Sequence, residues 1–360
     1  MLPNAVASNP FLGIFMHAIG AFFAATCYTP QKKVRRWSWQ TYWITQAAFC
    51  WFLLPITGAL LTIPDLFAVL REAPRAAMSA SFLLGAAYGI GGTAFGVAIR
   101  YIGYSLTYAI AVGLSSVLGT IIPPLLNGTL VSTLRKPGAG WIGTGIFVGA
   151  LGIGIAGWAG RLKEKDLEAK HGRGEFSLSK GLLLSLLAGV LSAVYGFALA
   201  AGEPIADIAS AHGAGVFRGN VSYIFANSGA FLTTALYCLY LHKKHGTFGE
   251  LFRLPAGPEK ARLSLNYALA ALTGAFWYGQ FFFYNLGHVR MGPYKFTSWA
   301  IHMLMLVMFS NLVGVVLREW RECRRSTRLT VRFALAVLVC AVLLLTYGNY
   351  LGDLAEKTVL

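Results

Sequence analysis

Ten long runs of mostly apolar residues recur along this 360-residue chain, and no Asp, Glu, Lys or Arg lies in the interior of any of them. A helix needs about 20 apolar residues to cross a bilayer, and runs of this length are the usual sign of a transmembrane helix. The pattern therefore predicts an all-α membrane protein. We expect ten transmembrane helices at residues 11–29, 40–61, 79–99, 103–126, 140–159, 181–201, 216–241, 264–286, 296–317 and 330–351.

The composition agrees with a membrane protein and argues against a nucleic-acid partner. Hydrophobic residues make up 56% of the chain and charged residues only 12%, whereas a soluble domain carries about a quarter charged residues. The net charge is +16, but the basic side chains fall in short loops, where they set membrane topology. The five cysteines have no metal-binding or redox spacing, so we expect reduced packing residues and no metal site.

The basic residues are distributed unevenly between alternate loops. Of the 30 Lys and Arg residues, 22 belong to the loops after the first, third, fifth, seventh and ninth runs, if Arg332 at the start of the tenth run is counted with the loop before it. Cytoplasmic loops carry such an excess of positive charge. We therefore expect a multi-pass protein of the cell (inner) membrane, surrounded by lipid, with both termini outside in the periplasm.

The longest charged segment divides the ten runs into two sets of five. Because five is odd, two sets with the same fold would cross the membrane in opposite senses. We expect a first five-helix repeat at residues 1–160, a cytoplasmic linker at 161–180 and a second, inverted repeat at 181–360. Inverted repeats are a transporter architecture that holds the substrate near the middle of the membrane. A constant offset of 189 supports a duplication, since it matches Gly85, Tyr88, Phe95 and Gly103 with Gly274, Trp277, Tyr284 and Gly292.

A glycine pattern in the fifth run resembles the dinucleotide-binding fingerprint. Residues Gly152–Gly157 read G-x-G-x-x-G, but they lie inside an apolar run and no strand precedes them. Small residues at this spacing let membrane helices approach one another closely. We therefore expect these glycines to serve helix packing.

The segment Leu272–Met303 is apolar but carries an unusual number of polar and aromatic side chains. On a helix, Trp277, Gln280, Tyr284 and His288 form one stripe. A polar group without a partner costs several kcal/mol in lipid, so the stripe indicates the lining of a wet cavity. The alternative is that these groups hold neighbouring helices together.

Two histidines stand out at membrane depth. Setting aside Tyr and Cys, His17 and His302 are the only ionisable residues in the interior of the predicted spans, and such residues are functional candidates by default. Each lies roughly 9 Å below the outer boundary at 1.5 Å per residue, as does Gln280, so the three side chains can share one layer. His288 and Arg290 would lie above it, at the outer mouth. For His17, a hydrogen bond to a neighbouring helix is the other interpretation.

Several motifs resemble the L-rhamnose–proton symporter family of the drug/metabolite transporter superfamily. They are WYGQFFFYNLGHVR, SWAIHM, GIFMHAIG, CYTPQKKVRRWSW and WFLLP, which begin at residues 277, 298, 13, 27 and 51. The resemblance implies a symporter that imports L-rhamnose with a proton. It implies no enzymatic activity and no cofactor, with the proton as the coupling ion.

The polar residues at depth suit a small neutral sugar. Amides can bond hydroxyls, and aromatic rings can cover the methyl and C–H face of a 6-deoxy sugar. The residues alone indicate a neutral polar solute; the resemblance supplies rhamnose and the proton. We expect His17 and His302 to couple the proton, and the substrate-binding residues to be Gln280, Trp277, Tyr284, Asn285, Trp299 and Tyr88.

Three alternatives stay open. The first is a transporter driven by sodium, and the second is an uncoupled transporter of another neutral sugar or metabolite. The third is a membrane-embedded enzyme acting on lipid-linked sugars, for which Asp207 and His212 are the nearest candidates to a catalytic pair. The preferred sugar and the oligomeric state do not follow from the sequence.

Reporter fusions test the predicted topology. A reporter that is active only in the periplasm should be active when fused after Leu360 and inactive when inserted within residues 161–180, because the second segment belongs to the positively charged side. A reporter that is active only in the cytoplasm should give the opposite pair of results. Cytoplasmic activity at Leu360 would contradict the predicted orientation of every span.

Overall fold

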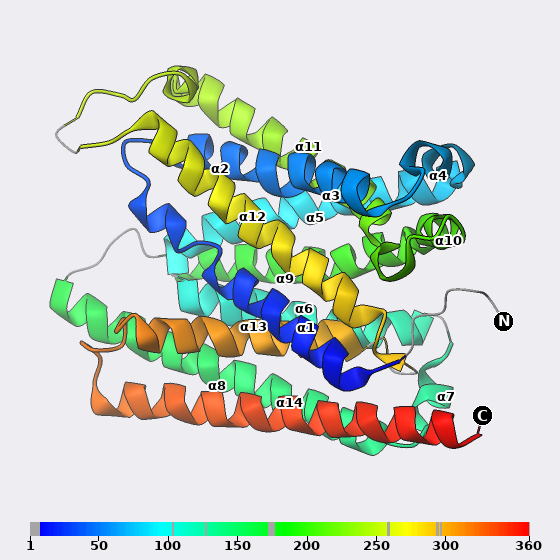
Figure 1. The fold of residues 1–360 in the computed structure, drawn as a ribbon. Coiled ribbons are helices and arrows are strands. Elements are labelled where there is room, and N and C mark those ends of the chain that lie inside the picture. Colours follow the sequence, from blue (N-terminus) through cyan, green and yellow to red (C-terminus); the bar gives the residue numbers. More distant parts are fainter. Residues whose placement is uncertain are drawn as a thin grey trace. The chain divides into compact units, whose positions relative to one another are not determined.

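The computed structural model describes residues 8–102, 104–126, 128–171, 177–257, 260–292, 295 and 297–359. All regular structure within these ranges is helical (Figure 1), which confirms the all-α prediction for this part of the chain. Residues 1–7, 172–176 and 360 of the expected repeats and linker lie outside the described residues. So do residues 103 and 296, at which two of the predicted spans begin.

Among the described residues, eight helical segments are long and apolar enough to cross a membrane. They correspond to eight of the ten predicted spans. The other two are α6 (Tyr104–Leu126), whose apolar segment is the shorter Leu106–Ile122, and α12 (Leu263–His288). Helix α12 has sufficient length, but its Trp, Tyr, Asn, Gln and His side chains lower its mean hydropathy. The residues that mark it as a functional candidate thus also weaken its membrane signal.

The chain forms two compact units, and each unit draws on both halves of the sequence. The first contains Thr26–Ile90 and Phe197–Phe282, and the second contains residues 8–25, Gly91–Gly196 and Phe283–Leu360. These units do not coincide with the expected repeats, which stay a prediction. The helices α1, α5, α9 and α12 each contribute residues to both units.

In the first unit, α11 packs along α2 and α3. The elements wholly within this unit are η1 (Pro30–Lys33), α2 (Trp39–Ala47), η2 (Ala48–Leu53), α3 (Leu54–Thr62), α4 (Leu66–Glu72), α10 (Glu203–Ala211), η3 (Gly215–Phe217), α11 (Asn220–His245) and η4 (Phe248–Leu251). Parts of α5 (Arg75–Ile102), α9 (Leu178–Ala201) and α12 complete it.

The span expected at 40–61 is not one regular helix, because the π-helical turn η2 separates α2 from α3. Pro55 has no backbone N–H, and a proline ring inside a helix clashes with the carbonyl four residues earlier, here that of Trp51. The wider turn relieves this clash, and in it the Leu54 N–H donates to the Phe49 carbonyl, five residues back. Pro55 therefore explains the irregularity.

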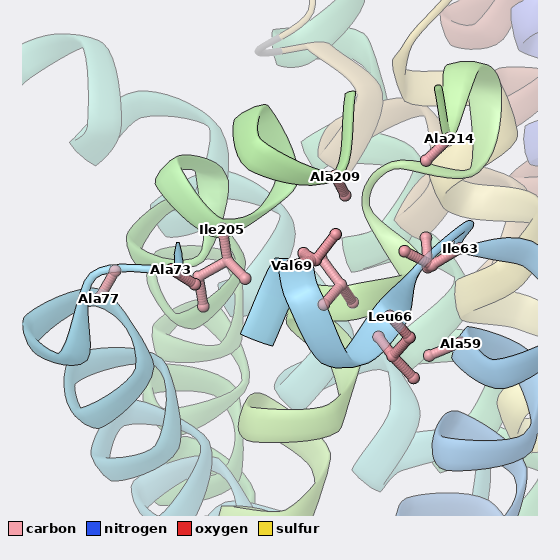
Figure 2. Close-up of a cluster of buried hydrophobic side chains, with 10 residues drawn as sticks. Ala59, Ile63, Leu66, Val69, Ala73, Ala77, Ile205, Ala209 and Ala214 are labelled. Carbon is pink, nitrogen blue, oxygen red and sulfur yellow. The ribbon is translucent and has the colours of Figure 1, made fainter. Parts of the chain in front are cut away.

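Two short helices that the sequence did not predict, α4 and α10, pack against each other in the first unit (Figure 2). They lie in the loops after the second and sixth predicted spans. Ten buried residues form their shared core: Ala59, Ile63, Leu66, Val69, Ala73, Ala77, Ile205, Ala209, Ala214 and Val221. These loops are thus packed structure with an apolar interior.

In the second unit, α8 and α14 form a long antiparallel pair (Figure 1). The elements wholly within this unit are α6, α7 (Leu130–Leu134), α8 (Ala139–His171), α13 (Thr297–Val316) and α14 (Arg325–Val359), and α1 (Pro10–Thr26) lies in it up to Ala25. A Cβ on Gly145 would come 2.8 Å from the Leu345 side chain, and one on Gly152 would come 2.9 Å from that of Leu338. The expected packing role is confirmed for Gly152 and for Gly157, whose Cβ would lie 2.8 Å from that of Ala109, but not for Gly154, which has no described atom within 4 Å of its Cβ position.

Two helices in the second unit extend beyond their predicted ends. Helix α8 continues to His171, so the first half of the expected linker at 161–180 is helical. Helix α14 continues to Val359, so Asp353 lies within a helix and not in a tail. Charged residues lower the hydropathy of such extensions, and the apolar runs therefore end before the helices do.

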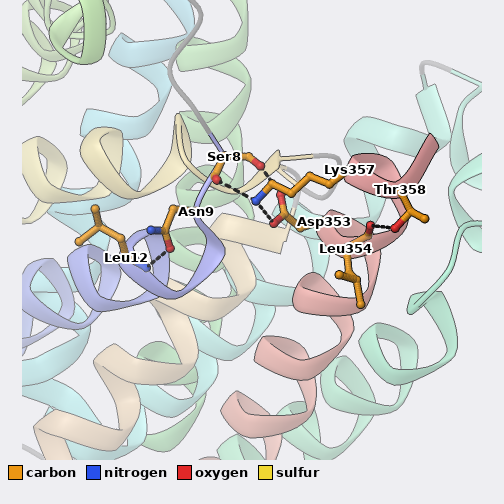
Figure 3. A network of polar contacts seen from close by, with 7 residues as sticks. All are labelled: Ser8, Asn9, Leu12, Asp353, Leu354, Lys357 and Thr358. Atoms are coloured by element: carbon orange, nitrogen blue, oxygen red, sulfur yellow. Dashed lines mark hydrogen bonds and ion pairs between the residues drawn. The ribbon is translucent and has the colours of Figure 1, made fainter. Parts of the chain in front are cut away.

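The start of α1 is held by a defined set of hydrogen bonds (Figure 3). The Asn9 side-chain oxygen accepts the Leu12 N–H at 3.1 Å, and Pro10 occupies the first helical position. An Asn cap followed by proline is a favoured helix start. The Asn9 N–H in turn donates to the Arg290 carbonyl at 3.0 Å.

The end of α14 also holds this segment (Figure 3). The buried Asp353 carboxylate accepts from the Ser8 hydroxyl, and it pairs with the Lys357 ammonium at 2.6 Å. Because both termini of the second unit meet here, the position of α1 is fixed at its first residues.

The packing of α5 against α11 can be tested by adding one methyl group at Gly85. A Cβ on Gly85 would lie 1.9 Å from the Ala226 carbonyl oxygen, a distance that backbone atoms cannot tolerate. We expect Gly85→Ala to lower the thermal unfolding midpoint of the detergent-purified protein strongly or to prevent folding.

The matched control for this test is Gly154→Ala on α8. No atom lies within 4 Å of the Cβ position at Gly154, so this change should leave the midpoint equal or slightly higher, as alanine is the better helix former. An unchanged midpoint for Gly85→Ala would contradict the close α5–α11 approach.

Candidate functional site

Three aromatic side chains of the second unit form a compact group. The His17 ring centre lies 5.2 Å from that of Tyr284 and 5.8 Å from that of His302. The ring centres of Tyr284 and His302 are 5.5 Å apart. All three residues are buried. Among the described residues, neither ring nitrogen of His17 has a hydrogen-bond partner, and neither does Nδ1 of His302. The structure thus brings together the two histidines that the sequence places at one depth.

Glycines explain how His17 reaches this position. A Cβ on Gly287 of α12 would lie 2.7 Å from the Gly13 carbonyl oxygen of α1 and 2.9 Å from Nε2 of His17. The backbones of α1 and α12 can therefore approach only because Gly13 and Gly287 carry no side chains. His17 lies one turn after Gly13, so its imidazole packs directly against α12.

Trp299 packs beside this group, and its hydrogen bond is already made. Its Nε1–H donates to the Ser115 carbonyl at 3.0 Å, and its ring is edge-on to Tyr284 at 5.7 Å. Gly119 makes room for it, because a Cβ there would lie 2.6 Å from the indole. Trp299 can therefore offer a ring face to a ligand, but its N–H is already used in the hydrogen bond to Ser115.

The other predicted residues of the second unit lie at the end of α12. His288 stacks on Tyr284 with ring centres 5.8 Å apart and shares a 3.1 Å hydrogen bond with Ser298. The Arg290 guanidinium donates to the Leu286 carbonyl, as basic side chains often do at helix C-termini. Asn285 is buried one residue after Tyr284.

The remaining predicted residues, Trp277, Gln280 and Tyr88, belong to the first unit. The Nε1–H of Trp277 and the Nε2 of Gln280 are buried, and no hydrogen-bond partner for either lies in the described part of the chain. Tyr88 on α5 is buried and lies edge-on to Trp51 at 5.9 Å, and Trp277 meets the same indole at 6.1 Å. Tyr88 and Trp277 thus both contact the ring of Trp51.

Sequence reasoning missed three residues of this group: Trp43, Gln46 and Trp51. Both indole N–H groups and the Gln46 Oε1 are buried, and no oxygen or nitrogen partner satisfies them. For Trp43 and Gln46, the signal that could have found them is a repeated spacing. Trp43 and Gln46 on α2 are separated by three residues, as are Trp277 and Gln280 on α12, so each helix presents an indole and an amide on one face.

Asp207 and His212, the candidates for an enzyme site, form ion pairs with other residues and not with each other. Asp207 pairs with Arg218, and His212 pairs with Glu72 at 3.1 Å, so Asp207 and His212 each have another partner. Within the part of the chain that the structure describes, no group of three or more His, Cys, Asp or Glu side chains could hold a metal ion. These contacts stabilise the packed loops that contain α4 and α10.

Comparison with known proteins gives one consistent family. The family model described as L-rhamnose-proton symport protein matches residues 4–352. The L-rhamnose-proton symporters of Salmonella typhimurium, Salmonella newport and Salmonella paratyphi A are each 35% identical over 346 residues, covering 94% of this chain and 97% of the relative. A solved structure described only as the crystal structure of a protein covers 96% of this chain and 98% of its own at 15% identity and TM-score 0.49. That likeness is too weak to support an argument.

Proposed function

Because this chain belongs to the L-rhamnose-proton symport protein family, we propose that it imports L-rhamnose, or a similar neutral 6-deoxy sugar, with a proton across the cytoplasmic membrane. The family match confirms the resemblance seen in the motifs. It also confirms that the chain is a secondary transporter and not an enzyme. The match over residues 4–352 is the observation that carries the proposal.

The membrane arrangement that we propose has ten spans. It adds α6 and α12 to the eight segments that meet the length and hydropathy of a span. The spans form two inverted five-helix repeats, with both termini in the periplasm and residues 161–180 in the cytoplasm. The excess of Lys and Arg in alternate loops supports this orientation.

We propose that the sugar is held by uncharged groups. In the first unit these are the amide of Gln280, the indole of Trp277 and the ring of Tyr88. Two of them bring buried donors without partners, and a sugar hydroxyl can satisfy such donors. In the second unit, Tyr284, Asn285 and Trp299 supply two aromatic rings and an amide.

The proton is proposed to bind the pair His17 and His302. An unperturbed imidazole titrates near pH 6.5, which lies within the working range of a proton-coupled carrier. A charged imidazole needs acceptors for its N–H groups, and a buried charge without them is strongly disfavoured. Because the ring of Tyr284 lies beside both histidines and Trp299 packs on Tyr284, a sugar bound there can supply hydroxyl acceptors. Proton and sugar would then raise each other's affinity.

Replacement of the two histidines tests proton coupling. We expect His17→Gln and His302→Gln to abolish sugar accumulation driven by a pH gradient in proteoliposomes, because glutamine cannot take up a proton. Some downhill exchange of labelled sugar should remain, since binding does not require the charge.

The control for this test is His245→Gln at the exposed end of α11, which should accumulate sugar like the wild type. If both buried variants still concentrate sugar, or if a sodium gradient alone drives uptake by the wild type, histidine-based proton symport is wrong.

Replacement of Gln280 tests the sugar contact. Loss of one hydrogen bond costs about 0.5–1.5 kcal/mol, so Gln280→Ala should raise the half-saturating L-rhamnose concentration by about two- to thirteenfold. Asn311→Ala is the matched control, because this amide donates to the Val307 carbonyl of its own helix at 2.9 Å. Wild-type affinity in a folded Gln280→Ala protein would remove Gln280 from the sugar-binding residues.

A further inference from the structure

We infer that Trp51, presented by the π-helical turn η2, contacts the transported sugar and donates its indole N–H to one substrate hydroxyl. This inference rests on the proposed function, because it adds a contact for the same neutral sugar. It also assigns a role to the irregular span between Trp39 and Thr62, which neither the motifs nor the family description explains.

The first argument is the state of the indole itself. Trp51 is 1% exposed, and its Nε1 has no hydrogen-bond partner apart from an interaction with the thiol of Cys50, a weak acceptor. A buried donor without an oxygen acceptor destabilises the protein. A ligand hydroxyl would supply that acceptor.

The second argument is the set of side chains that surround Trp51. Its ring meets Tyr88 and Trp277 edge-on, at 5.9 and 6.1 Å between ring centres. Gln46, five residues earlier in the same span, has a buried side-chain carbonyl oxygen without a partner among the described residues, so this span carries an unused acceptor as well as the Trp51 donor. Rings that cover a C–H face, together with free donors and acceptors for hydroxyls, are what a 6-deoxy sugar requires.

The third argument is the turn that carries Trp51. A π-helical turn is rare, occurs mostly as a single turn inside an α-helix, and is frequently found at functional sites. Pro55 produces the turn here, because its ring excludes a regular helix at the carbonyl of Trp51. The sequence thus maintains an irregular turn at the residue whose indole N–H has no oxygen acceptor among the described residues.

Trp320 of the second unit provides a useful contrast. It is also buried, and its Nε1 also lacks a partner. However, the Lys163 ammonium lies 4.8 Å from its ring centre, which gives this indole a structural role as a cation–π acceptor. An unsatisfied indole therefore does not by itself indicate a ligand; the surroundings of Trp51 do.

The test measures binding of L-rhamnose and of its 2-, 3- and 4-deoxy analogues to the purified protein. Trp51→Phe keeps an aromatic ring but removes the N–H. We expect it to weaken rhamnose binding about three- to tenfold and to leave the affinity for one deoxy analogue unchanged, because that analogue lacks the partner hydroxyl. Trp320→Phe should alter none of the four affinities.

A second variant tests the turn. Pro55→Ala should weaken rhamnose binding on its own but have no further effect in the Trp51→Phe background, since both changes remove the same contact. Additive effects would show that Pro55 acts independently of Trp51.

The outcomes separate this inference from the proposed function. If the wild type binds none of these sugars, both are overturned. If the wild type binds rhamnose but Trp51→Phe binds all four sugars equally well, only the Trp51 contact is overturned. An equal loss for all four sugars together with a lower thermal midpoint would also overturn it, because that pattern indicates a structural role.

Discussion

A polar side chain buried among apolar helices needs a partner, because neither lipid nor a packed core provides one. Many such groups here find one within the protein: the Tyr223 hydroxyl donates to the Phe281 carbonyl at 2.7 Å, and the Tyr42 and Thr273 hydroxyls are 2.7 Å apart. Among the described residues, His17 and Trp277 lack such partners, and the Trp51 N–H meets only the weakly accepting thiol of Cys50. We regard these exceptions as the groups through which a neutral sugar and a proton bind.

The long helices could be predicted from the sequence because hydropathy depends on composition over about 20 residues, which is a local property. The π-helical turn could not, although Pro55 inside a predicted span was its visible cause. Helices α4 and α10 are too short to give an apolar run, and their stability comes from the core that they share. The extension of α14 past residue 351 was missed because its last turns carry Asp353 and Lys357.

The candidate residues were predictable where a residue type is rare at depth. Histidine is such a type, so His17 and His302 could be singled out, and the structure places their rings 5.8 Å apart. Trp51 belongs to a run rich in aromatic residues, so its residue type alone does not mark it as a binding residue. The sequence also cannot tell which donors are already used: the N–H of Trp299 bonds Ser115, which lies 184 positions away along the chain.

If His17 and His302 couple the proton as proposed, the choice of imidazole determines when charge crosses the membrane. A coupling carboxylate is neutral when protonated and negative when empty, so the empty carrier would have to reorient with a buried charge. A histidine is neutral when empty and positive when loaded, so the charge moves together with the sugar. A potential that is negative inside then acts on the loaded carrier, at about 2.3 kcal/mol per charge and 100 mV. Since the predicted spans hold no Asp, Glu, Lys or Arg in their interiors, the proposed histidine pair would let the empty carrier reorient without moving a charge through lipid, and both the potential and the pH gradient would favour import.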